Sequence, residues 1–194
     1  MFDWFTFLTY AVMTTITPGP NTIVSMSNGS RKGLIRGLPL NLGMWCGFTI
    51  VMVGCAVLTS ALSMWIPKIK TPMLFVGAAY LLWLAWKCLR RSSEIQEKET
   101  KGDFLTGFSM QIVNPKVMLY GVMSYEGYIL PVFEGNIPAL LGFAVVLSTV
   151  GFVNGLIWSG CGSVCKVLFS KHARVVNTAM AAVLVWCAVK MLMS

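Results

Sequence analysis

The sequence predicts an all-α, polytopic membrane protein with six transmembrane helices. Of its 194 residues, 56% are hydrophobic and only 11% are charged, which is more apolar surface than one soluble core of this length can bury. A transmembrane helix needs about 20 apolar residues. Hydropathy gives six such runs, near 3–29, 38–63, 71–89, 104–130, 138–160 and 174–193, each bounded by Gly, Pro or charge. We therefore expect one membrane domain over 1–194.

The basic residues lie mainly in short clusters between the apolar runs. Clusters follow the first, third and fifth runs, whereas Lys68 and Lys70 follow the second and no Lys or Arg follows the fourth. Cytoplasmic loops are enriched in Lys and Arg, so the clusters predict that both termini face the periplasmic side of a bacterial inner membrane. The net charge of +8 then reflects topology, and a nucleic-acid partner is not expected.

The two halves of the sequence resemble each other. Residues 77–89 and 180–192 match at seven of thirteen positions, and Pro18 and Pro115, which interrupt the first and fourth runs, stand 97 residues apart. Because each half has three helices, the two copies would cross the membrane in opposite directions. This predicts a 3+3 inverted repeat, about 1–91 and 104–194, as in many secondary transporters. Chance recurrence of apolar residues is the alternative.

The segment Thr17–Asn21, with the sequence TPGPN, interrupts the first apolar run near mid-membrane. Each proline lacks a backbone donor and clashes with the carbonyl four residues earlier, which should release the carbonyls of Thr14 and Ile16. Thr17 has the chemistry of an N-cap and Pro18 that of a first helical residue. Non-helical backbone at this depth is tolerated where it lines a cavity or is covered by protein. A kink that only shapes packing is the alternative.

The fourth run has a similar interruption at Asn114–Lys116. Asn114 can cap a second half-helix that begins at Pro115, which should release the carbonyl of Gln111. Two half-helix N-termini could then converge on an anion, with Lys116 as a counter-charge. Freed carbonyls could receive an ammonium group, so a zwitterionic amino acid fits both requirements. The alternative for Lys116 is a side chain that reaches the membrane interface.

The two interruptions supply the candidate substrate-binding residues, which are Thr17, Pro18, Gly19, Pro20, Asn21, Asn114, Pro115 and Lys116. Four other polar residues could line the path or take part in coupling, namely Asn41, Gln111, Glu126 and Asn154. Interhelical hydrogen bonds would equally explain the asparagines, and an interfacial position would explain Glu126. No carboxylate is placed to hold a basic side chain deep in the membrane. This favours a small neutral amino acid.

The cysteines all lie within or beside apolar runs, at Cys46, Cys55, Cys88, Cys161, Cys165 and Cys187. We expect free thiols. No cofactor is expected, and no metal site either, because no histidine or acid lies beside Cys161 and Cys165. A thiol-disulfide electron carrier is a rival, but it would need a cysteine in each interrupted run, and 3–29 and 104–130 contain none. An enzyme is not expected, since the apolar runs carry no nucleophile-plus-base set.

Two glycine pairs with four-residue spacing allow helix backbones to approach closely. They are Gly43 with Gly47 in the second run and Gly151 with Gly155 in the fifth. Such pairs occur at helix contacts in membranes. We expect them to pack helices within one protomer, and a homodimer contact is the alternative.

With these motifs, the chain resembles the lysine-exporter/homoserine-threonine-resistance (LysE/RhtB) superfamily over nearly its whole length. The most specific match is Thr17–Asn21, supported by Gly33 and Gly37, by 77–83 and by Asn114–Lys116. Segments 81–87 and 119–122 are most similar to cysteine/O-acetylserine exporters. The resemblance implies efflux of a small amino acid from the cytoplasm, driven by the proton gradient. From the paired interruptions we expect one repeat to rock against the other. Homoserine/threonine-type export is the alternative within the superfamily.

Overall fold

The computed structural model describes residues 2–61 and 104–164, together with isolated helical positions between 75 and 89 and between 175 and 189. Within these parts the chain forms helices and no strands, so the all-α prediction is confirmed there. The predicted helices 71–89 and 174–193 and their sequence match lie largely outside the described residues. Cys88, Cys165 and Cys187 also lie outside them.

The first half begins with two helices separated by residues 17–19, which we call the first interruption. Helix α1 (Trp4–Ile16) starts after Asp3, whose carboxylate accepts a hydrogen bond from the Thr6 N–H at 3.1 Å. Helix α2 (Pro20–Arg36) runs beyond the expected end at residue 29, and the first basic cluster therefore lies on a helix. A kink at Gly33, with φ of 78°, interrupts α2 in a conformation that favours glycine.

Helix α3 (Leu38–Ala61) follows α2 after Gly37. It is one of two described helices that are long and apolar enough to cross a membrane. The other is α8 (Ile137–Val164), in the second half.

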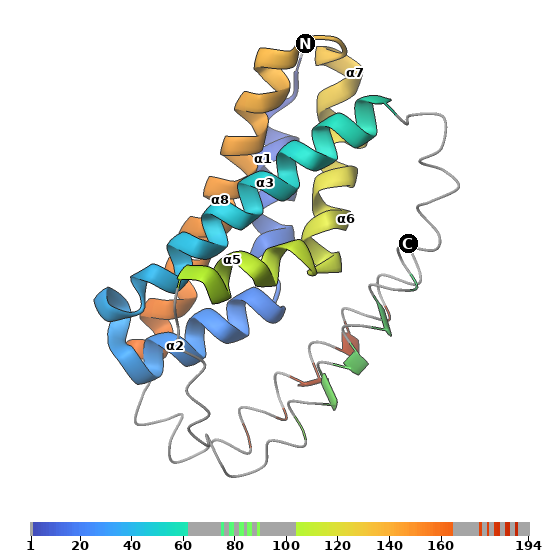
Figure 1. Cartoon of the computed structure of the whole chain (residues 1–194). Helices are drawn as coiled ribbons and strands as arrows, with labels where there is room; N and C mark the ends of the chain where they lie inside the picture. Colours follow the sequence, from blue (N-terminus) through green and yellow to red (C-terminus); the bar gives the residue numbers. More distant parts are fainter. Residues whose placement is uncertain are drawn as a thin grey trace.

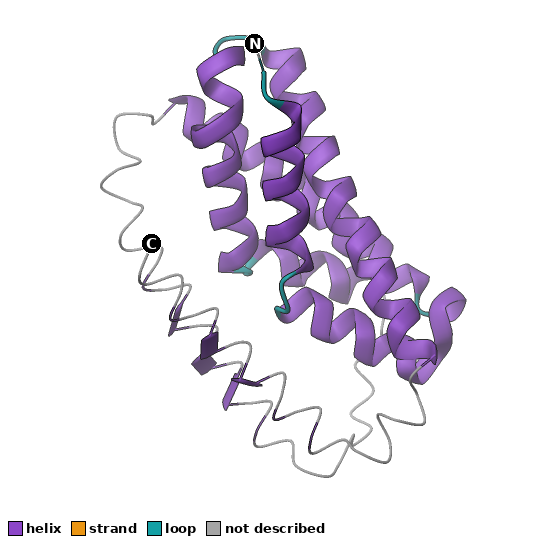
Figure 2. Ribbon diagram, turned by 180° about the vertical axis from the view of Figure 1, so that it is seen from behind, coloured by secondary structure: helices purple, strands orange, loops and turns teal. Residues whose placement is uncertain are grey.

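The second half begins with α5 (Phe104–Ile112) and α6 (Pro115–Ser124), separated by residues 113–114, the second interruption. A π-helical turn, η1 (Tyr125–Ile129), and α7 (Leu130–Phe133) lead on to α8. Figure 2 shows both interruptions as short loops close together in the middle of the helical body. The long helices α3 and α8 pack against each other and cross in Figure 1.

At the end of the molecule away from the N-terminus, α2 packs against α8 (Figure 1). A Cβ on Gly162 would overlap the carbonyl oxygen of Met26, and one on Gly29 would overlap that of Ser159. Only glycine allows backbones to approach this closely.

Helix α3 meets α5 in a second crossing of the same kind. A Cβ on Gly43 would overlap the Phe104 carbonyl oxygen, and one on Gly107 would overlap that of Leu40. The Gly43 pair therefore packs helices within the chain. Gly151 of the other pair faces the Phe48 ring instead, with its Cβ position 3.1 Å from the ring.

The N-terminal end is packed by aromatic side chains. The rings of Phe7 and Phe143 are buried, and their centroids are 5.4 Å apart. The centroid of the Phe2 ring is 5.2 Å from that of Phe7 and 5.1 Å from that of Phe143. The Tyr125 hydroxyl donates to the Leu140 carbonyl at 2.9 Å, which ties η1 to α8. The interruptions thus lie between an aromatic end and an end joined by glycines.

Candidate functional site

The first interruption ends two residues later than predicted. Gly19, not Thr17, is the N-cap of α2, and Pro20, not Pro18, is its first residue. A residue that precedes proline is pushed out of the helical region. Both Thr17, with ψ of 127°, and Gly19, with φ of −164°, precede prolines and are non-helical. The second proline therefore delays the helix.

Because Gly19 has no side chain, another residue caps α2. The Thr22 hydroxyl accepts a hydrogen bond from the Gly19 N–H at 2.7 Å and donates to the Gly19 carbonyl at 2.9 Å. Neither the Asn21 N–H nor the Thr22 N–H donates to any described residue. The first turn of α2 therefore presents free donors, together with the positive end of its dipole.

Two carbonyls at the first interruption, those of Thr15 and Thr17, accept bonds from side chains, and the release of the Thr14 and Ile16 carbonyls stays a prediction. The Asn154 amide donates to the Thr15 carbonyl, and the Lys116 ammonium donates to the Thr17 carbonyl at 2.7 Å. Both donors lie in the other half of the chain. The end of α1 is thus satisfied by α6 and α8.

The second interruption satisfies its own backbone. The Asn114 side chain accepts from the Lys116 N–H at 3.1 Å, and the Asn114 carbonyl accepts from the Val117 N–H at 3.1 Å. The Asn114 N–H donates to the Gln111 carbonyl at 3.2 Å, so that carbonyl is not released as predicted. The N-terminus of α6 is therefore occupied by Asn114, and only the α2 N-terminus is open to an anion.

An amide network joins the two interruptions. The Asn21 side-chain amide donates to the Gln111 side-chain oxygen at 2.7 Å, and the Gln111 side-chain amide donates back to the Asn21 side-chain oxygen at 3.1 Å. The Asn114 amide also donates to the Asn21 oxygen, at 3.0 Å. Gln111 and Asn114 are buried. A network of buried amides that satisfy one another holds its side chains in one arrangement.

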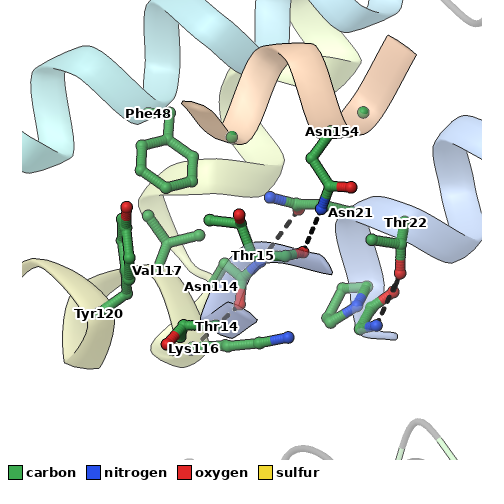
Figure 3. A pocket seen from close by; sticks show the side chains of 14 residues that line it. Thr14, Thr15, Asn21, Thr22, Phe48, Asn114, Lys116, Val117, Tyr120 and Asn154 are labelled. Carbon is green, nitrogen blue, oxygen red and sulfur yellow. Dashed lines mark hydrogen bonds between the residues drawn. The ribbon is translucent and has the colours of Figure 1, made fainter. Parts of the chain in front are cut away.

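A pocket that is partly open to solvent lies against this network. Its walls come from both interruptions and from α3, α6 and α8, as Figure 3 shows. The lining residues are Thr14, Thr15, Gly19, Pro20, Asn21, Thr22, Phe48, Asn114, Lys116, Val117, Tyr120, Gly151, Asn154 and Gly155.

The polar groups of this pocket are distributed unevenly. The Lys116 side chain lies against Gly19, beside the open N-terminus of α2. Its Nζ is 3.2 Å from the point that a Cβ on residue 19 would occupy. Two buried side-chain oxygens, Oδ1 of Asn154 and the hydroxyl of Tyr120, have no hydrogen-bond partner among the described residues. Phe48 supplies apolar surface (Figure 3). The site can therefore receive an anionic group, a hydrogen-bond donor and a small apolar part.

The structure brings most of the predicted residues together. Six of them line the pocket, namely Gly19, Pro20, Asn21, Asn114, Lys116 and Asn154. Gln111 stands behind Asn21, and Thr17 contributes its carbonyl. Pro18 and Pro115 shape the backbone without lining the pocket.

Two of the predicted path residues lie elsewhere. Asn41 accepts from the Ser25 hydroxyl at 2.8 Å and lines a smaller neighbouring pocket. Glu126 is exposed on η1 and does not line the pocket. Its role in coupling stays a prediction.

The sequence interpretation named Thr14 for its carbonyl alone and missed several other lining residues, namely Thr15, Thr22, Phe48, Val117, Tyr120, Gly151 and Gly155. Helical spacing could have found one of them, because Tyr120 follows Lys116 by four residues and shares its face of α6. Phe48 is an ordinary apolar residue of α3, and no local pattern marks it.

Comparison with known proteins identifies the family. The cysteine/O-acetylserine efflux protein of Klebsiella pneumoniae subsp. pneumoniae is 36% identical over 186 residues, covering 95% of this chain and 94% of that protein. The protein of the same name from Escherichia coli O1:K1 is 34% identical over 185 residues, with the same coverage. No solved structure matches. The model of the LysE type translocator family matches residues 12–194, and the chain therefore belongs to this family of membrane transporters.

Proposed function

We propose that this protein exports small neutral amino acids, such as cysteine or O-acetylserine, and binds them in the pocket between the two interruptions. The observation that carries the proposal is the composition of that one pocket. One side of the pocket, which we call the cationic wall, is positive because it contains Lys116 and the N-terminus of α2. The same pocket contains the side-chain oxygen of Asn154, which has no partner among the described residues. A zwitterion needs a positive site for its carboxylate and an acceptor for its ammonium group.

The substrate carboxylate binds at the cationic wall. The free N–H groups of Asn21 and Thr22 and the helix dipole favour an anion at the start of α2. The Lys116 side chain already reaches this place, since it lies against Gly19. A charge-assisted hydrogen bond from its ammonium group would add to the backbone donors.

The substrate ammonium group binds at carbonyl oxygens. Asn154 holds the Thr15 carbonyl with its amide nitrogen and keeps its own oxygen unpartnered among the described residues. A buried acceptor of this kind is costly unless a donor meets it. The ammonium group supplies that donor.

The charge of the pocket disfavours basic side chains. Its lining contains Lys116 and no Asp or Glu. A lysine or arginine substrate would bring a second positive charge to a site without a compensating carboxylate, which is unfavourable at low dielectric. The names of the similar proteins, cysteine/O-acetylserine efflux proteins, agree with a neutral substrate.

In the membrane, we place both interruptions at the midplane of a 3+3 inverted repeat, with the termini on the periplasmic side of the inner membrane. Support comes from the order of elements. In each half, two helices are separated by an interruption, the second of them begins at a proline, and a long helix follows. Support for the orientation comes from Arg31, Lys32 and Arg36, which lie on α2, away from the N-terminus. Efflux is then coupled to the proton gradient by alternating access.

Transport from vesicles tests the proposal. Vesicles loaded with labelled cysteine, O-acetylserine, threonine or lysine are compared with and without a pH gradient. The Lys116→Met variant should lower efflux of the neutral substrates about 10- to 100-fold, whereas Lys32→Met, an exposed lysine of α2, should not. Equal efflux by both variants, or lysine as the preferred substrate, would contradict the proposed site.

A further inference from the structure

The Tyr120 hydroxyl is a buried polar group that the binding of a zwitterionic backbone leaves unused. Tyr120 is 3% exposed, and its hydroxyl has no hydrogen-bond partner in the described part of the chain. Other hydroxyls of the pocket are bonded, since Thr15 donates to the Ala11 carbonyl at 2.8 Å and Thr22 bonds Gly19. A buried hydroxyl without a partner in a pocket points to a ligand that supplies one.

The ring of Tyr120 is held in place, so its hydroxyl has a fixed position. It stacks on Tyr10 with centroids 6.1 Å apart and planes at 14°, and it meets the Phe48 ring edge-on at 5.8 Å and 74°. Figure 3 shows Tyr120 beside Phe48 among the side chains that line the pocket. A preorganised donor and acceptor discriminates between ligands better than a mobile one.

The position of Tyr120 relative to Lys116 indicates which part of the substrate it meets. The two residues are four apart on α6 and so lie on one face, about 6 Å apart along the helix axis. With the carboxylate at Lys116 and the ammonium at Asn154, the remaining arm of a small amino acid is its side chain. That side chain is directed to the Tyr120 hydroxyl and the Phe48 ring.

We propose that Tyr120 determines specificity by hydrogen bonding to the sulfur or oxygen atom in the side chain of the substrate. This inference rests on the proposed function and narrows its substrate class to amino acids with a heteroatom one carbon beyond Cα, such as thiol, hydroxyl and ester side chains. Asn154 accepts a hydrogen bond from the ammonium group, which all amino acids share. Tyr120 contacts the side chain, in which they differ.

The same hydroxyl excludes aliphatic side chains of similar size. With 2-aminobutyrate, which has a methyl group in place of the thiol of cysteine, the Tyr120 hydroxyl would stay buried and unpaired. Sites built to hydrogen bond a substrate group reject analogues that lack it far more strongly than apolar pockets reject a change of size. The preference for cysteine over 2-aminobutyrate therefore depends on one oxygen atom of the protein.

A ratio of two substrates in two matched variants tests this inference. Efflux of labelled cysteine, O-acetylserine and 2-aminobutyrate is measured for the unmodified protein, Tyr120→Phe and Tyr10→Phe. The unmodified protein should favour the heteroatom substrates over 2-aminobutyrate by roughly tenfold or more, and Tyr120→Phe should lower that ratio by roughly tenfold. Tyr10→Phe removes a hydroxyl from the adjacent stacked ring, outside the pocket lining, and should keep the ratio.

The results separate this inference from the proposed function. No saturable efflux of any amino acid by the unmodified protein would overturn the proposed function. Efflux that depends on Lys116 but has the same ratio in Tyr120→Phe would overturn the role of Tyr120 alone. If Tyr120→Phe fails to insert, the unmodified protein still decides, because equal efflux of cysteine and 2-aminobutyrate would overturn the inference.

Discussion

The two helix interruptions look alike in sequence and differ in how their backbones are satisfied. The first, at residues 17–19, depends on Lys116 and Asn154 from the other half of the chain for its carbonyls. The second, at residues 113–114, closes on itself through Asn114. The second is therefore a rigid framework, whereas the first has partners that a ligand can replace.

The difference follows from one residue. An asparagine N-cap covers the first N–H groups of its own helix, but a glycine N-cap cannot. The N-cap of α6 is Asn114, and the N-cap of α2 is Gly19. Only α2 therefore keeps open donors for a carboxylate. Four substitutions can break or sharpen this contrast.

The largest effect on stability should come from Asn114→Ala. The change removes the cap of α6 and leaves the side-chain oxygen of the half-buried Asn21 with one donor fewer. We expect the free energy of unfolding to fall by about 2 to 4 kcal/mol, measured by denaturation in mixed micelles. Asn136→Ala removes an exposed side-chain bond to the Ala139 N–H and should cost about 1 kcal/mol or less. If both variants lose the same free energy of unfolding, Asn114 contributes no more to stability than an exposed cap, and the second interruption is not a rigid framework.

Asn154→Leu should follow, with a smaller loss of stability and a larger loss of transport. The Thr15 carbonyl loses its donor, but the unpartnered oxygen of Asn154 disappears as well. The two changes partly offset each other, so the free energy of unfolding should fall by only about 1 to 2 kcal/mol. Efflux from vesicles should fall about tenfold or more because the ammonium acceptor is gone. Normal efflux would remove Asn154 from the site.

Thr22→Val tests the hydrogen bonds that the Thr22 hydroxyl makes to the backbone of the N-cap residue, Gly19. Valine keeps the shape of threonine and removes the hydroxyl that bridges the Gly19 N–H and carbonyl. We expect a loss of about 1 kcal/mol, measured by thermal melting in detergent. Thr22→Ser retains the hydroxyl and should recover most of that loss. If serine behaves like valine, packing and not the cap explains the effect.

The smallest effect should come from Asp3→Asn, at an exposed cap. Hydrogen bonds from the Thr6 hydroxyl, at 2.5 Å, and from the Thr6 N–H lower the pKa of Asp3 below 3.8. Because the folded pKa is lowered, the stabilisation is present above pH 3.8 and is lost as the pH falls through the folded pKa. Melting temperatures at pH 7 and pH 3 should therefore lie slightly closer together in Asp3→Asn. A wider gap would contradict this cap.

Much of the second interruption could be predicted from the sequence, because its signals are local. Asn114 is the N-cap and Pro115 the first residue of α6, where the motif places them. The first interruption has two prolines, either of which could start a helix. The rule for residues before proline disfavours Pro18 here, since Gly19 must also leave the helical region.

The rest of the site depends on tertiary contacts. The carbonyls that find donors are those facing Asn154 and Lys116, and no proline rule identifies Thr15 and Thr17. Phe48 enters the pocket because Gly151 leaves room for its ring. Such pairs, far apart in the chain, have no signal in a single sequence.

The glycine crossings constrain how the molecule can move. Both join helices from different halves, α2 with α8 and α5 with α3. Packed helices can slide past each other when the side chains between them repack. At the glycine crossings backbone contacts backbone, so no side chain lies between the helices to repack. A boundary between 1–91 and 104–194 would have to part both crossings. A motion that keeps α2 with α8 and α3 with α5 would leave both of these backbone contacts intact.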